Sequence, residues 1–276
     1  MYWQNKFKSP EVEDPNAALE AQIIDIRKQH KNWGYRRICG YLKRLGQRVN
    51  HKRVQRIIKK LGLQVTSYGR KSRKYYSYKG NVGRTASNRV HRRFDTCIPH
   101  QKITTDTSEF KYYKHDSKGN ETVKKLYLDP FMDLFNREII SYRIAPSPTA
   151  QNIMSGLNEA IEKTNDCPYR RTFHSDQGWG YQMHAYVDTL KKHKIFQSMS
   201  RKGNCHDNSV MENFFGILKQ EIYYGRKFYS YEELESEINE FIKYYNEDRI
   251  KEKLDWMSPT EYRLAKSNCT KISEEA

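Results

Sequence analysis

The positive charge of this chain is concentrated in its first 100 residues, and this division limits the folds open to it. The 276-residue chain has a formal net charge of +17. Residues 1–100 contain 24 Lys/Arg and 6 Asp/Glu, with no acid between Asp25 and Asp95, whereas residues 101–276 contain 26 and 27. The asymmetry predicts a nucleic-acid-binding N-terminal part joined to a near-neutral catalytic part. A basic surface that serves only solubility is the alternative.

The length and the cysteine content exclude other classes of protein. A chain of 276 residues can hold one substantial core and a small second domain. Its five cysteines are far apart and show no paired spacing, so neither a zinc ribbon nor a disulfide framework is expected. No apolar run approaches the roughly 18 residues that cross a bilayer. We therefore expect no membrane partner and a location in the reducing cytoplasm.

The N-terminal part has the pattern of three short helices. Helices are predicted at 17–30, 32–46 and 51–63, with Asn50 as the N-cap of the third and Gly62 at its end. The third helix has an apolar inner stripe and a basic outer face, which consists of Lys52, Arg53, Arg56, Lys59 and Lys60. This is typical of a helix-turn-helix whose third helix enters the major groove of double-stranded DNA. A helical dimerisation or packing module is the alternative.

A basic and aromatic segment follows these helices. The helical pattern disappears after residue 63, and tyrosines are interleaved with the basic residues Arg70, Lys71, Arg73 and Lys74. Basic side chains can follow a phosphate backbone while aromatic rings stack on bases or sugars. We interpret residues 64–100 as a linker that contacts DNA, with a solvated linker that binds nothing as the alternative.

The remainder of the chain predicts a mixed α/β domain. Strands are expected at 103–112, 124–135, 137–145, 171–176 and 194–200. Helices are expected at 149–164, with Thr149 as its N-cap, at 181–193, within 198–221, and after the capping boxes that begin at Ser230 and Ser258. Three adjacent strands followed by alternating helices and strands indicate a mixed sheet with helices on both faces.

Three acidic residues occur where a strand ends or a helix begins. Asp106 lies in a β-prone run, Asp176 directly follows a short apolar strand, and Glu212 lies near the start of the helix within 198–221. Lys219 lies seven residues after Glu212 and therefore on the same helical face. An isolated glutamate there is most simply a favourable charge at a helix N-terminus. Together, however, the three acids can converge into one cage.

Converging carboxylates indicate a metal site. Two carboxylates about 4 Å apart repel by roughly 4 kcal/mol at an effective dielectric constant near 20, so a fold tolerates them only with a proton or a metal ion. Oxygen ligands with open positions suit Mg²⁺ or Mn²⁺, and a pair of such ions can assist the in-line displacement at a phosphodiester. The residue types alone indicate either a metal-dependent nuclease or a strand-transfer enzyme.

The segments around these acids resemble the Asp-Asp-Glu core of the retroviral-integrase superfamily, with 35 residues between Asp176 and Glu212. More narrowly, the chain resembles the downstream-frame protein of the insertion-sequence-three family of bacterial transposases. The matching blocks cover nearly the whole chain and include VNHKRVQRIIKKLGL, TTDTSEF, LYLDPFMDLFNREIISY, HSDQGWGYQ and SMSRKGNCHDNSVMENFFGILKQE. The resemblance implies a helix-turn-helix domain (1–63), the linker (64–100), a ribonuclease H-like catalytic core (101–225) and C-terminal helices that pack on it (226–276).

The resemblance also implies roles for individual residues. Asp106, Asp176 and Glu212 would be the catalytic residues and would bind Mg²⁺, for which Mn²⁺ would substitute. Lys219 matches the basic residue that the family uses on the terminal DNA. The turn around Asp176 would be shaped by Ser175 and Gly178. Asp129, Asp133 and Asp207 match family positions outside the triad. Glu109 lies three residues after Asp106, and His174 is interpreted as a strand-end residue, with a ligand as the alternative. Asp207 or Asn208 is placed to cap the helix, and Asn208 and Asn213 either orient Glu212 or only cap and pack.

Three departures from related patterns refine this expectation. Gly180 and Tyr181 stand where many relatives carry Gln-Tyr, which predicts a local difference in that loop. The paired His and Cys spacing of the retroviral zinc domain is absent from the sequence, and no leucine-zipper heptads are visible. In the insertion-sequence-three family an upstream-frame protein with such a zipper is usually fused to this one by ribosomal frameshifting. The chain is therefore expected to be the catalytic half.

The predicted function is that of a DNA transposase, which cuts insertion-sequence ends and joins them to target DNA for integration and recombination. Its expected partners are double-stranded DNA, the upstream-frame protein and further copies of itself in an oligomer on DNA, and its expected location is the nucleoid of a bacterium. Two alternatives remain: a nuclease that cuts without joining, and a DNA-binding regulator without catalysis.

Overall fold

The computed structural model describes residues 14–67, 85–115, 117 and 119–274. The chain divides into two compact units, with the boundary between residues 69 and 70. Each unit has its own hydrophobic core. Among the described residues, no helix is long and apolar enough to cross a membrane.

The described residues of the N-terminal unit form three helices, as the sequence predicts. They are α1 (Ala17–Gln29), α2 (Tyr35–Arg44) and α3 (His51–Lys60). The Asn50 side chain caps α3 by accepting a hydrogen bond of 2.9 Å from the Lys52 N–H. Gly62, at a φ of +66°, ends that helix because glycine adopts left-handed backbone angles without strain. The apolar stripes meet in a core that includes Ile23, Trp33, Ile38, Leu42, Val54, Ile57 and Ile58.

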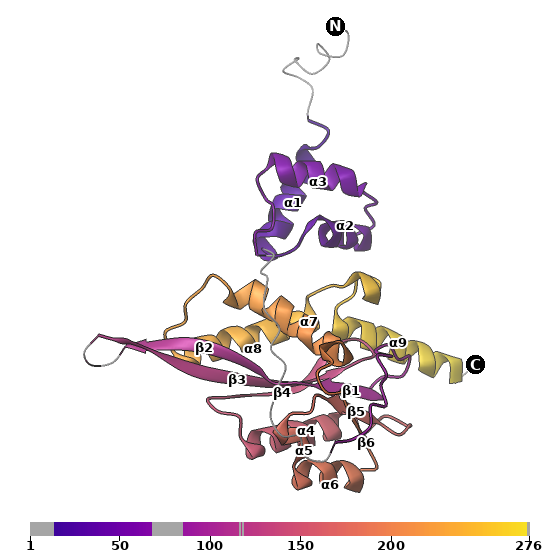
Figure 1. Cartoon of the computed structure of the whole chain (residues 1–276). Helices are drawn as coiled ribbons and strands as arrows, with labels where there is room; N and C mark the ends of the chain where they lie inside the picture. The colour runs from indigo at the N-terminus through magenta and orange to yellow at the C-terminus, as the bar shows by residue number, and fades with distance from the viewer. Residues whose placement is uncertain (1–13, 68–84, 116, 118, 275–276) are drawn as a thin grey trace. The chain divides into compact units, whose positions relative to one another are not determined.

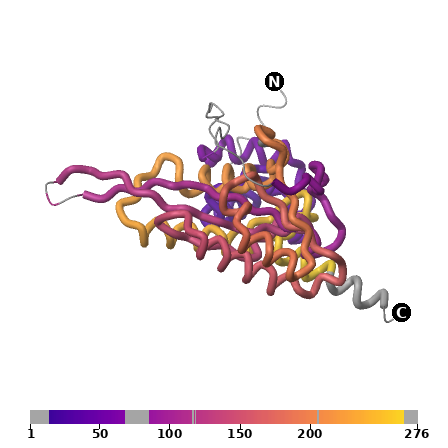
Figure 2. Tube along the Cα trace, turned by 60° about the horizontal axis from the view of Figure 1, so that its bottom comes forward, coloured from indigo at the N-terminus to yellow at the C-terminus, as the bar shows by residue number. Residues whose placement is uncertain are grey.

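The C-terminal unit is built on one six-stranded sheet. Its strands are β1 (Lys102–Thr105), β2 (Ser108–His115), β3 (Glu121–Asp133), β4 (Ile139–Ala145), β5 (Thr172–Ser175) and β6 (Phe196–Met199). β4 pairs with one edge of β3, while β2 and β1 follow one another along the opposite edge. β5 and β6 extend the sheet beyond β1, and both run parallel to it. The β2–β3 hairpin projects beyond the rest of the sheet (Figures 1 and 2).

The predicted single strand at 103–112 was wrong, because the chain leaves the ladder at Asp106 and Thr107. Thr105 pairs with Phe131 and Ser108 pairs with Leu128, so the same register would place Asp106 opposite Pro130. Proline has no backbone N–H to donate to a ladder. The interruption therefore falls at the predicted catalytic aspartate and frees its backbone from the sheet.

Helices cover both faces of the sheet, which confirms the predicted fold class. One face packs against α4 (Ala150–Lys163), α5 (Trp179–Gln182) and α6 (His184–Lys192), and the other against α7 (Ser209–Leu218) and α8 (Tyr231–Glu247) (Figure 1). The expected helix at 181–193 is in fact two helices, because Met183 has an extended ψ of 140° between them. The last helix is α9 (Pro259–Glu274).

Four predicted N-caps form as expected and fix where helices begin. Besides Asn50, they are Thr149 before α4, Ser230 before α8 and Ser258 before α9. At Ser258 the capping box is reciprocal, since the Glu261 N–H donates to the Ser258 hydroxyl and the Glu261 carboxylate accepts from the Ser258 N–H.

Candidate active site

The parallel pairing of β1 with β5 brings two of the predicted catalytic acids together. Thr104 pairs with His174, so the same register carried two residues further places Asp106 beside Asp176, just beyond the ends of both strands. A backbone N–H fixes one oxygen of each carboxylate: Thr107 donates to Asp106 Oδ1 and Gly178 donates to Asp176 Oδ1, both at 2.8 Å. A Cβ on residue 178 would lie 2.9 Å from that Asp176 oxygen, so a larger residue there would displace the carboxylate from this position.

The third acid, Glu212, is brought to the same strand ends by α7. The residue before this helix is Asn208, and it is tied to β1: its Oδ1 accepts from the Thr104 hydroxyl at 2.8 Å, and its Nδ2 donates to the Thr105 carbonyl at 3.2 Å. These bonds therefore place the start of α7 against Thr105, the residue before Asp106. The expectation that Asp207 or Asn208 caps α7 through its side chain was wrong, because both side chains are engaged elsewhere.

The electrostatics show that these acids act on one another. Burial, with the charges of Asp176, Glu212 and Asp129, raises the pKa of Asp106 to about 8, against the lowering effect of the Thr107 N–H. Burial also raises the pKa of Asp176 and of Glu212. Within the described chain, however, no three His, Cys, Asp or Glu side chains are close enough to hold a metal ion as they stand. The arrangement is a group of interacting acids in which the Asp106 carboxyl keeps its proton up to about pH 8.

This repulsion predicts a dependence of stability on pH. Since the pKa of Asp106 is raised in the folded protein, the folded chain binds a proton that the unfolded chain has lost between about pH 4 and pH 8. The stabilisation that the Asp106 proton gives the folded state is complete below pH 4 and is lost as the pH rises to 8. We expect Asp106→Asn to unfold at least about 2 °C above the parent at pH 8 in EDTA, with no difference near pH 4. Thermal unfolding by circular dichroism checks this, and equal midpoints at pH 8 would contradict it.

A buried chain of polar side chains supports Asp106 through its neighbour Thr107, and no local pattern in the sequence predicts it. The Thr107 hydroxyl donates to Asp129 Oδ1 at 2.5 Å and lies 3.4 Å from the Tyr181 hydroxyl. Asp129 and Tyr181 are almost fully buried, and Asp129 Oδ2 has no hydrogen-bond partner among the described residues. Thr107 thus holds Asp106 through its N–H while Asp129 and Tyr181 hold Thr107. Only the closeness of Thr107 to Asp106 and of Tyr181 to Asp176 in sequence hinted at this link.

The other acids noted in the sequence have structural partners. Buried Asp207 binds Arg92 and Arg201 at 2.9 and 2.8 Å, and these arginines hold its pKa well below the usual range. Asp133 accepts N–H groups of His100 and Phe135. Glu109 pairs with Lys125, and buried His174 bonds to Ser198 and to the Asp207 carbonyl.

The glycine at position 180, where many relatives carry another residue, has a packing reason. Gly180 leaves room for Ile153, whose Cδ1 would lie 2.3 Å from an added Cβ.

The predicted DNA contacts lie in different settings. Lys219 donates to the Glu109 carbonyl at 3.0 Å and lies over the Phe110 ring. On α3, Lys60 pairs with Asp14 and Glu20, and Arg53 bonds to Asn16, so part of this basic face also stabilises the N-terminal unit. Lys52, Arg56 and Lys59 are exposed on the same helix. The remaining candidates, Arg70, Lys71, Arg73 and Lys74, lie outside the described residues.

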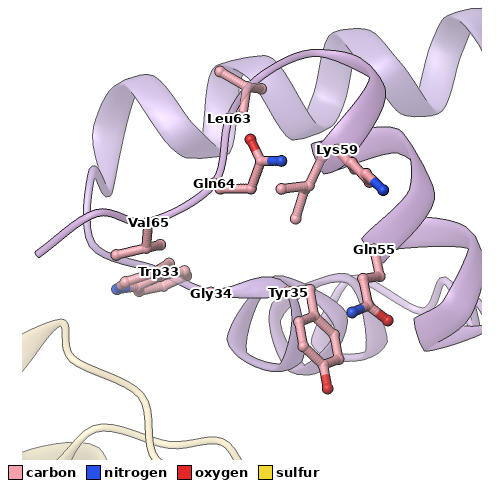
Figure 3. A pocket seen from close by; sticks show the side chains of 9 residues that line it. Trp33, Gly34, Tyr35, Gln55, Lys59, Leu63, Gln64 and Val65 are labelled. Atoms are coloured by element: carbon pink, nitrogen blue, oxygen red, sulfur yellow. The ribbon is translucent and has the colours of Figure 1, made fainter. Parts of the chain in front are cut away.

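A hollow in the N-terminal unit lies beside this basic face. It measures about 300 Å³ and lies between the start of α2 and the end of α3, with Trp33, Tyr35, Gln55, Lys59 and Val65 in its lining (Figure 3). Carbon atoms form nearly all of its surface, so it is not a phosphate-binding hollow.

Comparison with known families follows the same two-unit division. Residues 98–205 match the Integrase core domain family, residues 212–266 match a second family of the same description, and residues 13–71 match the HTH-like domain family. The transposase InsK of insertion sequence element IS150 from Escherichia coli K12 is 42% identical over 252 residues, which cover 91% of this chain and 84% of that protein. The chain belongs to the insertion-sequence transposases. Its predicted family, helix-turn-helix domain and integrase core are confirmed.

Further relatives of the transposase are similar over most of their length. A transposase-like protein of Haemophilus influenzae is 46% identical over 221 residues, which cover 80% of this chain and 96% of the relative. Among solved structures, the HTLV-2 integrase catalytic core domain in complex with magnesium aligns with a TM-score of 0.43 and 15% identity, over 60% of this chain and 97% of that one. The Mos1 mariner transposase catalytic domain aligns with a TM-score of 0.39 and 18% identity, over 52% and 70% of the two chains.

Proposed function

We propose that this transposase cuts DNA at the ends of its insertion sequence and joins those ends to target DNA in a metal-dependent reaction. Asp106, Asp176 and Glu212 are its catalytic residues. The observation that carries the proposal is the position of Asp106 and Asp176 at the ends of adjacent parallel strands, together with the pKa of Asp106, which the charges of Asp176 and Glu212 help to raise. Such interacting acids are typical of a site that needs a cation.

The donor chemistry fits Mg²⁺, and Mn²⁺ as its substitute. The side chains of Asp106, Asp176 and Glu212 would hold the ion through oxygen atoms alone, which both metals accept. When bound, the metal supplies charge stabilisation for the attacking and leaving oxygens of phosphoryl transfer. Before binding, the Thr107 and Gly178 N–H groups fix one oxygen of each aspartate, so little side-chain entropy remains to be lost.

The chemistry consists of two in-line displacements at phosphorus. Water attacks the phosphodiester at the element's end, a P–O bond to the 3′ oxygen breaks, and a 3′-hydroxyl is released. That hydroxyl then attacks a phosphodiester of the target, forming a new P–O bond as the target's own 3′ oxygen leaves. No covalent bond to the protein forms in either step. The transposase positions the attacking oxygen, the phosphorus and the leaving oxygen in line and neutralises the charge that develops.

A labelled duplex that carries the element's end tests this function. The chain is incubated with the duplex and a target plasmid in Mg²⁺, in Mn²⁺ and in EDTA, alone and fused to its upstream-frame partner. We expect cleavage and joining in both metals and neither in EDTA. Cleavage without joining would favour the nuclease. Binding without cleavage in either protein would favour the regulator.

The proposal also covers the partners of the transposase and its location in the cell. We infer that the upstream-frame protein contributes end recognition, that the transposase acts as an oligomer on DNA, and that it works at the nucleoid in the bacterial cytoplasm. The basic residues of α3, of the segment 70–74 and Lys219 are the proposed DNA contacts. Dependence of joining on the fused partner and on protein concentration tests the first two inferences.

Replacing Thr107 should weaken catalysis without removing a metal ligand. Thr107→Val keeps the shape and the N–H but leaves the Asp129 carboxylate buried without its hydroxyl donor. We expect cleavage to fall about 10- to 100-fold and the Mg²⁺ concentration for half-maximal rate to rise, as for other groups that support metal ligands. Thr107→Ser, which restores the hydroxyl, should recover most of the rate. An unchanged Mg²⁺ dependence in the valine variant would show that Thr107 does not position Asp106.

A further inference from the structure

The outer edge of the sheet carries two arginines that form no ion pair with any acid in the described part of the chain. Arg170 and Arg89 flank the ring of Phe196, the first residue of β6, with guanidinium carbons 3.5 and 4.2 Å from its centroid. Arg170 also donates through Nε to the Lys194 carbonyl at 2.9 Å. Both arginines are exposed, and neither forms an ion pair with an acid of the described chain. A guanidinium that stacks on a ring is held in place while its N–H groups stay available.

A second pair of arginines continues this row toward the active site. Arg92 and Arg201 share the single buried carboxylate of Asp207, which leaves one positive charge in excess. The segment that carries Arg89 and Arg92 is fixed along β6, since the Arg89 N–H donates to the Ser198 hydroxyl at 2.9 Å. We call Arg89, Arg92, Arg170 and Arg201 the arginine row.

The arginine row ends beside the catalytic acids. Ser200, the residue before Arg201, donates its N–H to the Ser175 carbonyl at 2.9 Å and accepts from the Gln177 side chain at 3.0 Å. These bonds join the row to the turn that holds Asp176. From Phe196 to Arg201 the chain can span about 16 Å at the rise of a strand, a distance along which a DNA duplex presents several phosphates.

We propose that the arginine row binds the phosphate backbone of the duplex that is being cut, on the side of β6, with Arg89 and Arg170 as its outer contacts. The occupant is this duplex because the row ends at the turn of Asp176 and lies on the catalytic unit itself. The contacts are to phosphates, so they position DNA without reading its sequence. This inference rests on the proposed function only for the identity of the DNA that is bound.

Binding of the full chain to a labelled duplex of arbitrary sequence, measured by anisotropy from 0.05 to 0.3 M salt, tests the row. We expect the double variant Arg89→Gln and Arg170→Gln to bind about 10- to 60-fold more weakly at 0.1 M salt, with a salt dependence shallower by about 1.8, as the loss of two phosphate contacts requires. Arg89→Lys with Arg170→Lys retains both charges and should stay within about threefold of the parent. If the double glutamine variant does not fold, Arg89→Gln alone should reduce the salt dependence by about 0.9.

A matched control and a reaction assay complete the test. Lys243→Ala with Lys253→Ala removes two exposed charges elsewhere on the same unit and should leave the salt dependence near that of the parent. An unchanged salt dependence in the double glutamine variant would overturn the proposal. Loss of joining with cleavage intact would also overturn it, because the row would then hold the target. Reduced binding by a chain that neither cuts nor joins would keep the row and reject the proposed reaction instead.

Discussion

Glu212→Gln is expected to abolish both cleavage and joining while DNA binding stays at the level of the parent. The change keeps the size of the side chain but removes the charge that, with Asp106 and Asp176, would hold the metal. We expect a rate loss of at least about 1,000-fold, equivalent to about 4 kcal/mol in activation free energy. Single-turnover cleavage of an end-bearing duplex in Mg²⁺ measures the loss, and anisotropy measures binding.

The adjacent residue Asn213 provides a control for this variant. It is exposed on the same turn of α7, and Asn213→Ala removes its side chain without touching an acid. We expect its cleavage rate to stay within about fivefold of the parent, since exposed substitutions seldom disturb a fold. If Glu212→Gln cut DNA at the parental rate, the assignment of the triad would be wrong. If both variants were inactive, the first turn of α7 would matter for a reason other than the carboxylate.

Glu221→Ala should cause the largest loss of stability that we predict. Glu221, in the turn after α7, accepts bonds of 3.0 and 2.8 Å from Nε and an Nη of Arg249, just beyond α8. The two side chains are only 2% and 5% exposed. Removing the carboxylate leaves the guanidinium buried without this counter-charge, which typically costs about 3–5 kcal/mol. Hydrogen exchange of the α7 and α8 amides measures the local free energy of opening.

A surface pair in the same unit serves as the matched control. Arg226 and Glu237 also form a two-bonded ion pair, at 3.0 and 2.6 Å, but their side chains are 49% and 30% exposed. Glu237→Ala should therefore cost less than about 1 kcal/mol. Replacing Glu221 and Arg249 together with methionine should restore most of the stability, because neither charge then needs a partner. Equal losses for Glu221→Ala and Glu237→Ala would show that burial does not set the value of the pair.

Local patterns in the sequence were sufficient to predict the division into parts, the helix boundaries and the family. The caps at Asn50, Thr149, Ser230 and Ser258 were predictable because each depends on a side chain and an N–H two or three residues away. The strand of Asp176 and the helix of Glu212 followed from periodicity, and the resemblance then singled out these acids with Asp106. Their roles in catalysis are still predictions.

Contacts between distant residues decided the geometry of the site. The strand break at Asp106 falls opposite Pro130 across the sheet, and the bonds of Asn208 depend on Thr104 and Thr105, about a hundred residues earlier. The same holds for Tyr181 beside Thr107 and for Arg89 against Phe196. A single sequence records which side chains are present and how they repeat locally. Register and packing select which of them meet, because those contacts form only when the sheet and its helices assemble.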